Sequence, residues 1–76
     1  MIELKEFIDE LGLGELSDQV FKILSTENFE VYTLLSTPKQ DLQLIFNHLK
    51  IANGIQAKIF AGIQKRKVMV EFFMWQ

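Results

Sequence analysis

The chain has 76 residues, a net charge of −2 and a hydrophobic share of 49%. This length allows a single domain, close to the lower size limit for a core that folds unaided. The chain has no cysteine and one histidine, His48, which excludes a disulfide framework, a thiolate metal site and the usual clusters of histidine ligands. We see no secretory signal, and no stretch approaches the roughly 20 apolar residues of a membrane-spanning helix. We therefore expect an intracellular domain, cytoplasmic or nuclear, without a cofactor or a small-molecule substrate.

The two ends of the chain carry opposite charge. Residues 1–30 hold eight acidic and two basic side chains, whereas residues 48–76 hold five basic side chains and one acidic. Such asymmetry suits head-to-tail self-association or binding to an acidic partner. The alternative is that both sets are simply solvated helix faces. The basic excess does not extend over the whole chain, so generic nucleic-acid binding is not favoured.

The first predicted helix is marked by apolar residues at helical spacing. They recur at positions i, i+3, i+4 and i+7, namely Leu4, Phe7, Ile8 and Leu11. Gly12 follows where a left-handed residue closes a helix, and Leu13 is placed for the apolar contact of a Schellman turn. The spacing therefore predicts a short amphipathic helix that ends just before Gly12.

The second and third helices are predicted by shorter signals. A second apolar stripe consists of Leu16, Val20, Ile23 and Leu24. Ser25 and Thr26 are expected to break that helix and to offer a capping oxygen to the next one. Residues 29–35 are apolar but few, so a short helix is predicted there with a strand as the alternative.

The fourth and fifth helices have the clearest boundaries. Thr37 is predicted to cap the fourth helix, with Pro38 as its first residue and Gln40 completing a capping box. Its stripe consists of Leu42, Ile45, Phe46 and Leu49. The fifth helix is predicted to start at Asn53 and Gly54, and it carries isoleucines at 55, 59 and 63. Seen as a whole, the pattern favours a small all-α domain closed by one long final helix.

The order and spacing of these residues resemble the sterile alpha motif (SAM) family, over about residues 4–67. Residues 7–16 (Phe-Ile-Asp-Glu-Leu-Gly-Leu-Gly-Glu-Leu) are similar to the family's first helix and its Leu-Gly-Leu turn. The other similar positions are residues 26–30 with Leu34 and Leu35, then Asp41, Leu42, Ile51, Gly54, Lys58, Ile59 and Ile63. The chain departs from the family pattern at Phe7, Val31 and Lys50, which replace a frequent Trp and two frequent glycines. Between Asp41 and Ile51 it is also about one helical turn longer.

The resemblance implies a compact five-helix bundle over residues 1–67, with residues 68–76 as an apolar extension of the long C-terminal helix. It also implies a protein–protein interaction module, within a longer scaffold or regulatory protein, that oligomerises with itself or with another SAM-like domain. Its basic "end-helix" surface would consist of Asn53, Gly54, Gln56 and Lys58. Its acidic "mid-loop" surface would consist of Glu27, Glu30 and Asp41. The structural alternatives are an ordinary helix start and acids that compensate helix dipoles.

The basic tract Lys65, Arg66 and Lys67 has three interpretations. The default is a solvated helix end whose cations complement the helix dipole. The tract could instead contact an acidic partner, or RNA phosphates, since some members of the resembled family bind RNA hairpins. The RNA interpretation requires a continuous basic patch, and the neighbouring first helix is acidic, so nucleic-acid binding is not favoured.

The tail, residues 68–76, is unusually apolar and follows the basic tract directly. It is expected to be covered, because exposed apolar patches of this kind indicate interfaces. The favoured interpretation is packing against Ile2, Leu4 and Phe7, followed by contact with a partner or a second copy. Membrane-interface contact is a third and weaker interpretation.

Catalysis is not expected. His48 lies on the flank of a predicted helix, where a structural histidine is far commoner than a general base. No serine lies at a recognisable triad spacing from it, and Gly12 and Gly14 have no preceding strand to form a phosphate-binding loop. The sequence therefore favours a binding module over an enzyme.

Overall fold

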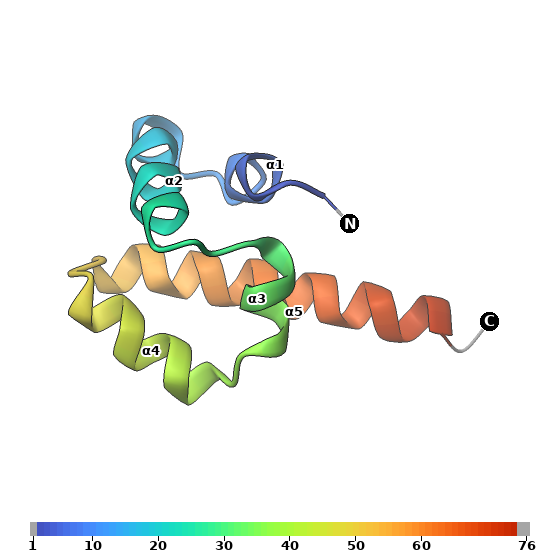
Figure 1. Cartoon of the computed structure of the whole chain (residues 1–76). Coiled ribbons are helices and arrows are strands. Elements are labelled where there is room, and N and C mark those ends of the chain that lie inside the picture. The colour runs from blue at the N-terminus through green and yellow to red at the C-terminus, as the bar shows by residue number, and fades with distance from the viewer. Residues whose placement is uncertain (1, 75–76) are drawn as a thin grey trace.

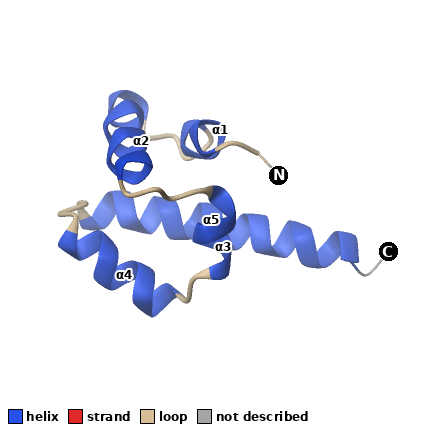
Figure 2. Ribbon diagram, viewed as in Figure 1, coloured by secondary structure: helices blue, strands red, loops and turns tan. Residues whose placement is uncertain are grey.

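The computed structural model describes the backbone of residues 2–74 and the side chains of residues 2–69. This part of the chain folds into five α-helices and one 3-10 turn, with no strand (Figures 1 and 2). In chain order they are α1 (Leu4–Asp9), η1 (Gly14–Leu16), α2 (Ser17–Thr26), α3 (Val31–Ser36), α4 (Lys39–His48) and α5 (Asn53–Met74). The predicted all-α fold with five helices is confirmed. The strand alternative for residues 29–35 is wrong, because α3 occupies most of that segment.

One apolar core joins all five helices. Its most completely buried large side chains are Phe7, Ile8, Leu24, Leu34, Leu42, Phe46 and Ile59. Each predicted stripe contributes at least one member, because a side chain at helical spacing faces the same side of its helix. The other residues of the predicted stripes are buried or half-buried, except Leu16, which lies in η1 and is exposed.

The long helix α5 organises the fold. In Figure 1, α1 and α2 lie on one side of it, α4 lies on the other, and α3 crosses near its middle. The molecule measures 39 × 25 × 22 Å along its principal axes. The C-terminal part of α5 projects beyond the other helices (Figure 1). The start of α5 and its C-terminal part are therefore presented at opposite ends of the molecule.

The turn after α1 agrees with the sequence only in part. Helix α1 ends at Asp9, two residues earlier than predicted, and neither the Gly12 N–H nor the Leu13 N–H makes the backbone hydrogen bond of the predicted Schellman turn. Gly12 has φ +72°, the left-handed conformation expected of it, and Leu13 is buried. A residue with a Cβ adopts this conformation with strain, so glycine is favoured here. The chain can then reverse into η1 and α2.

The end of α2 differs from the prediction. Ser25 and Thr26 do not break the helix, because α2 includes both residues and the Ser25 hydroxyl donates to the Lys22 carbonyl. The helix is closed by Asn28, which has φ +61°. The Phe29 N–H donates to the Leu24 carbonyl at 2.9 Å and the Asn28 N–H to the Ser25 carbonyl at 3.0 Å, which is the Schellman pattern. The caps predicted from Ser25 and Thr26 are therefore wrong.

The same turn closes α4. Lys50 has φ +61°, the Ile51 N–H donates to the Phe46 carbonyl at 3.0 Å, and the Lys50 N–H donates to the Asn47 carbonyl at 3.1 Å. Lys50 stands where the resembled family often has glycine. A lysine in this conformation costs about 1–2 kcal/mol, because its Cβ approaches the following carbonyl. The buried side chain of Ile51 anchors the turn to the core.

The capping box predicted before α4 is also wrong. The Thr37 hydroxyl donates backwards to the Thr33 carbonyl at 2.7 Å and so helps to close α3. Pro38 is the capping residue and lies outside the helix, whose first residue is Lys39 and whose start has no side-chain cap. Thr37 carries an oxygen that suits either helix, and the spacing alone did not indicate which one receives it.

Helix α5 runs without a break across the boundary that was predicted at residues 67 and 68. The side chains of Val68 and Met69 are exposed. The expectations for the rest of the tail, residues 70–76, concern side chains outside the described part of the chain. Among the residues described, no helix combines the length and apolar character that crossing a membrane requires.

Candidate protein-docking surfaces

The start of α5 is exposed and electropositive. The first intrahelical bond runs from the Gln56 N–H to the Ala52 carbonyl at 2.9 Å, so the N–H groups before it have no partner within the helix. Both Asn53 and Gly54 are exposed, and so is Lys50 in the preceding turn. Unpaired N–H groups and the helix dipole together favour an anionic group at this position. The surface can therefore accept a carboxylate of a partner.

Gln56 is placed differently from its expected role at this surface. Its side chain is only 4% exposed. The Nε2 group donates to the Asn47 Oδ1 at 2.9 Å and to the Ile51 carbonyl at 2.8 Å. These bonds hold the turn between α4 and α5 against α5 itself. Gln56 thus shapes the surface from inside, and its side chain is not available to a partner.

Lys58 lies one turn further along α5 and is exposed. Its Nζ donates to the Gly12 carbonyl at 3.2 Å. The contact places the ammonium group beside the turn between α1 and η1, next to the start of α5. Two lysines, Lys50 and Lys58, therefore accompany the exposed first turn.

The three predicted mid-loop acids are all exposed but come from different elements. Glu27 follows α2 and Glu30 precedes α3, so both flank the connection between these helices. Asp41 belongs to the first turn of α4, which Figure 1 shows at the lower edge of the molecule, away from that connection. The structure therefore groups Glu27 and Glu30 along one connection and places Asp41 apart from them.

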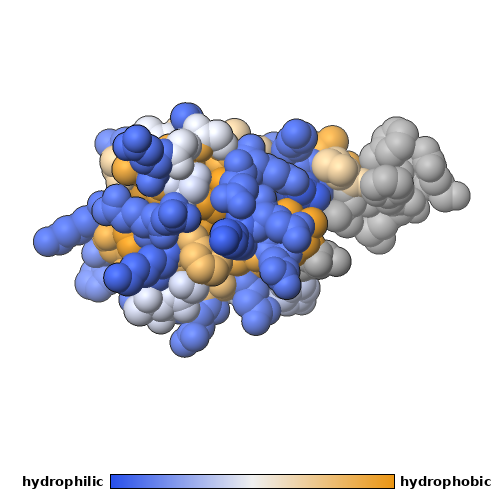
Figure 3. All heavy atoms as spheres, turned by 90° about the horizontal axis from the view of Figure 1, so that it is seen from above, coloured by the Kyte–Doolittle hydropathy of each residue, from blue (hydrophilic) through white to orange (hydrophobic). Residues whose placement is uncertain are grey.

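The remaining acids of the N-terminal half are also on the surface. Those in and beside α1, η1 and α2 are all exposed: Glu3, Glu6, Asp9, Glu10, Glu15 and Asp18. Figure 3 views the molecule from the side of α1 and α2, and hydrophilic side chains cover most of that face. The acids of the N-terminal half are therefore on the surface, and one of them, Glu10, is paired with Arg66 of α5.

The basic tract does not form one patch. Consecutive residues of a helix point about 100° apart, so the three side chains diverge. Lys65 is exposed, Arg66 forms an ion pair with Glu10 just after α1, and Lys67 lines a groove between α4 and α5. Arg66 thus has a structural partner, and Lys67 belongs to a surface that the sequence did not indicate.

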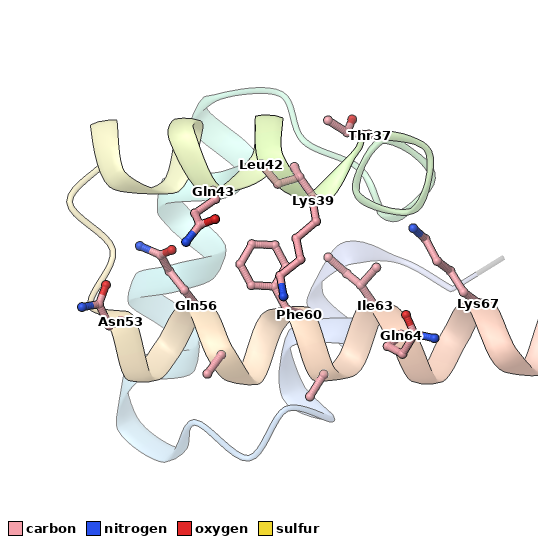
Figure 4. A pocket seen from close by; sticks show the side chains of 12 residues that line it. Thr37, Lys39, Leu42, Gln43, Asn53, Gln56, Phe60, Ile63, Gln64 and Lys67 are labelled. Carbon is pink, nitrogen blue, oxygen red and sulfur yellow. The ribbon is translucent and has the colours of Figure 1, made fainter.

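That groove is a hollow with a volume of about 660 Å³. Figure 4 shows Phe60 at its centre, with Lys39 reaching over it from α4 and Lys67 at one end. The Lys39 Nζ lies 5.3 Å from the centroid of the Phe60 ring, within the range of a cation–π contact. Asn53 lies at the other end, so the groove begins at the exposed start of α5. We call it the α4–α5 groove.

A smaller hollow of about 350 Å³ lies beside α3. It is lined by Ile2, Glu3, Leu4, Glu30, Val31 and Tyr32. Tyr32 is 64% exposed, although Val31 next to it is buried. A large aromatic side chain stands there among carboxylates.

Comparison of the chain with protein-family models, with curated proteins and with solved structures gave no match. Among the described residues, no three potential ligand side chains come together in a group that could hold a metal ion. The sequence indicated the start of α5 through its isoleucine spacing and its Asn-Gly pair. It did not indicate the α4–α5 groove, because Lys39 of α4 is distant in the chain from Phe60 and Lys67 of α5 and meets their face only through helix packing.

Proposed function

We propose that this chain is a SAM-like protein-interaction module that binds a second copy of itself, or another such domain, through the start of α5. The observation that supports this best is the exposed first turn of α5 with Lys50 and Lys58 beside it. The role is binding and not catalysis.

The partner's contribution would be an acidic surface. A carboxylate that approaches Asn53 and Gly54 would accept hydrogen bonds from unpaired backbone N–H groups, and each such contact contributes about 0.3–1 kcal/mol at an exposed site. One contact is therefore too weak, and several must act together. The exposed acids Glu27 and Glu30 of a second copy supply two carboxylates on one connection. Because these charges are exposed, salt would screen their attraction.

Contact between two different surfaces of the same chain is heterologous. A complex of any size therefore has one free basic surface at one end and one free acidic surface at the other. Association can continue into an open polymer, or the two ends can meet and close a ring. The expected product is thus a distribution of sizes that grows with concentration.

The test is the substitution Lys58→Glu, studied by sedimentation velocity. We expect about tenfold weaker association, because an attractive charge becomes a repulsive one, at a cost of about 1.4 kcal/mol. The matched control is Lys22→Glu, which makes the same charge change at an exposed position of α2. Equal effects of the two substitutions would show that only net charge matters and would contradict the proposed surface.

A further inference from the structure

The α4–α5 groove has an aromatic floor and basic sides. Phe60 is half-buried, and its ring lies 5.5 Å from the ring of Phe46 in the core, centroid to centroid. Leu42 and Ile63 line the groove as well and are buried. Among the described side chains that line it, Lys39 and Lys67 are charged and both are basic. The groove is therefore suited to an apolar, preferably aromatic, side chain that is flanked by carboxylates.

The hollow beside α3 presents that combination on the same chain. Tyr32 is the most exposed aromatic side chain of the described residues, at 64%. Glu30, two residues earlier, is also exposed, and Glu3 lines the same hollow. Tyrosine is a favoured interface residue because it offers a large apolar area at a small cost in side-chain entropy.

We propose that Tyr32 of a second copy inserts into the α4–α5 groove and packs on Phe60, while Glu30 and Glu3 of that copy pair with Lys39 and Lys67. This inference rests on the proposed function, since it adds an anchor and a receiving groove to the contact at the start of α5. In the combined contact Glu30 pairs with the groove, Glu27 remains for the start of α5, and Asn53 joins the groove to that helix start.

Size and symmetry both suit this arrangement. A hollow of about 660 Å³ lies within the range of roughly 300–1,000 Å³ of sites that hold ligands rich in apolar atoms. The groove and the Tyr32 surface share no lining residue, so one copy can offer both at once. The contact is heterologous and leaves a free groove at one end of every chain of copies.

The experiment blocks each half of the contact separately and follows association by sedimentation velocity. Tyr32→Ala removes the anchor. Ala61→Leu fills the groove without changing the charge, at an exposed position of α5 that lines it. Each substitution is expected to weaken self-association at least about tenfold, as truncation of an anchor residue does.

A charge reversal tests the basic sides of the groove. The double substitution Lys39→Glu with Lys67→Glu is expected to weaken self-association to a similar extent. Its control is Lys5→Glu with Lys22→Glu, at exposed positions of α1 and α2.

A mixture gives the decisive result. The Tyr32→Ala chain keeps its groove and the Ala61→Leu chain keeps its tyrosine, so the two together should form a complex of two chains and nothing larger. A mixture that stays at the mass of single chains would overturn the inference. Thermal unfolding followed by circular dichroism establishes that each variant is folded.

The same data separate this inference from the proposed function. If Lys58→Glu weakens association while Tyr32→Ala and Ala61→Leu leave it unchanged, the contact at the start of α5 stands and the groove contact is refuted. If Tyr32→Ala and Ala61→Leu weaken association and Lys58→Glu acts like its control, the groove is supported and the helix-start surface is contradicted.

Discussion

The two sides of α5 are packed in opposite ways. On the side of α1, Gly62 has no side chain, and a Cβ built there would overlap Leu11 and come within 3.3 Å of the Phe7 ring. On the side of α4, Phe60 and Lys39 stand between the helices and leave the α4–α5 groove open. Both sides use the same helix, but side chains close tightly over a glycine on one side, and Phe60 and Lys39 line an open hollow on the other.

This difference separates stability from binding. Close contact at Gly62 buries Phe7 almost completely, and burial of a side chain of this size contributes about 1.5–3 kcal/mol. The side chain of Phe60 in the open groove gains less of this stabilisation, because it is less completely buried, and the groove remains open to another molecule. A domain of this size is marginally stable, so it has little stability to spare for a second open side.

The largest effect is expected in the core that both sides of α5 border. Ile59 is the most completely buried residue of α5 among those described. Ile59→Ala should lower the free energy of unfolding by about 3 kcal/mol, because it removes apolar contacts and leaves a cavity. Urea denaturation measures this change, and Ile55→Ala, at a half-buried position, should cost less. Equal losses at the two positions would contradict the central place of Ile59 in the core.

The closed side is tested by a smaller change. Gly62→Ala should destabilise the fold relative to Gly54→Ala by about 1–3 kcal/mol, because Leu11 and Phe7 must move to admit a methyl group. Nothing lies within 4 Å of a Cβ at Gly54, so the control makes the same chemical change in the same helix without crowding. If both variants unfold at the same urea concentration, α1 does not depend on the close approach at Gly62.

The turn at Lys50 connects α4 to α5, and a substitution there can raise the stability of the fold. Lys50→Gly should stabilise the fold by about 1 kcal/mol, because glycine adopts the observed φ of +61° without strain from a Cβ. Lys50→Ala removes the same charge but keeps the Cβ, and it should give no comparable gain. Thermal unfolding of the pair tests this directly, and an equal gain in the glycine and alanine variants would show that charge, and not strain, is responsible.

The smallest effect is expected at the ion pair on the closed side. Arg66 and Glu10 are partly exposed, so their coupling should be about 0.5 kcal/mol and should decline with added salt. A double-mutant cycle with Arg66→Gln and Glu10→Gln measures it. A coupling above about 2 kcal/mol would mean that this pair, and not apolar packing, holds α1 against α5.

The sequence predicted the helices well where buried apolar residues recur at helical spacing. Phe7 and Ile8 lie three and four residues after Leu4, Val20 and Leu24 are four residues apart, and so are Leu42 and Phe46; these six are buried members of the predicted stripes, and Leu4 is half-buried. The helix ends were predicted less well. Asn28 and Lys50 close α2 and α4 in the left-handed conformation, and neither position is occupied by the glycine that usually indicates such a turn. A lysine at that position has no local signal, because its conformation is imposed by burial of the following Ile51.

The candidate surfaces were likewise predictable only in part. Asn53, Gly54 and Lys58 lie close together at the start of one helix and could be grouped from the sequence. Gln56 lies in the same segment, yet it is buried, and its amide donates to the Asn47 and Ile51 oxygens in the neighbouring turn. The α4–α5 groove depends on how far apart two helices lie, which is a property of packing and not of spacing.

Sedimentation of the wild-type chain over a wide range of concentrations, at low and at physiological salt, tests self-association through α5 most directly. The weight-average mass should rise well above that of one chain as concentration increases, and it should fall again when salt screens the charges. A mass of one chain at every concentration and both salt levels would contradict self-association through α5.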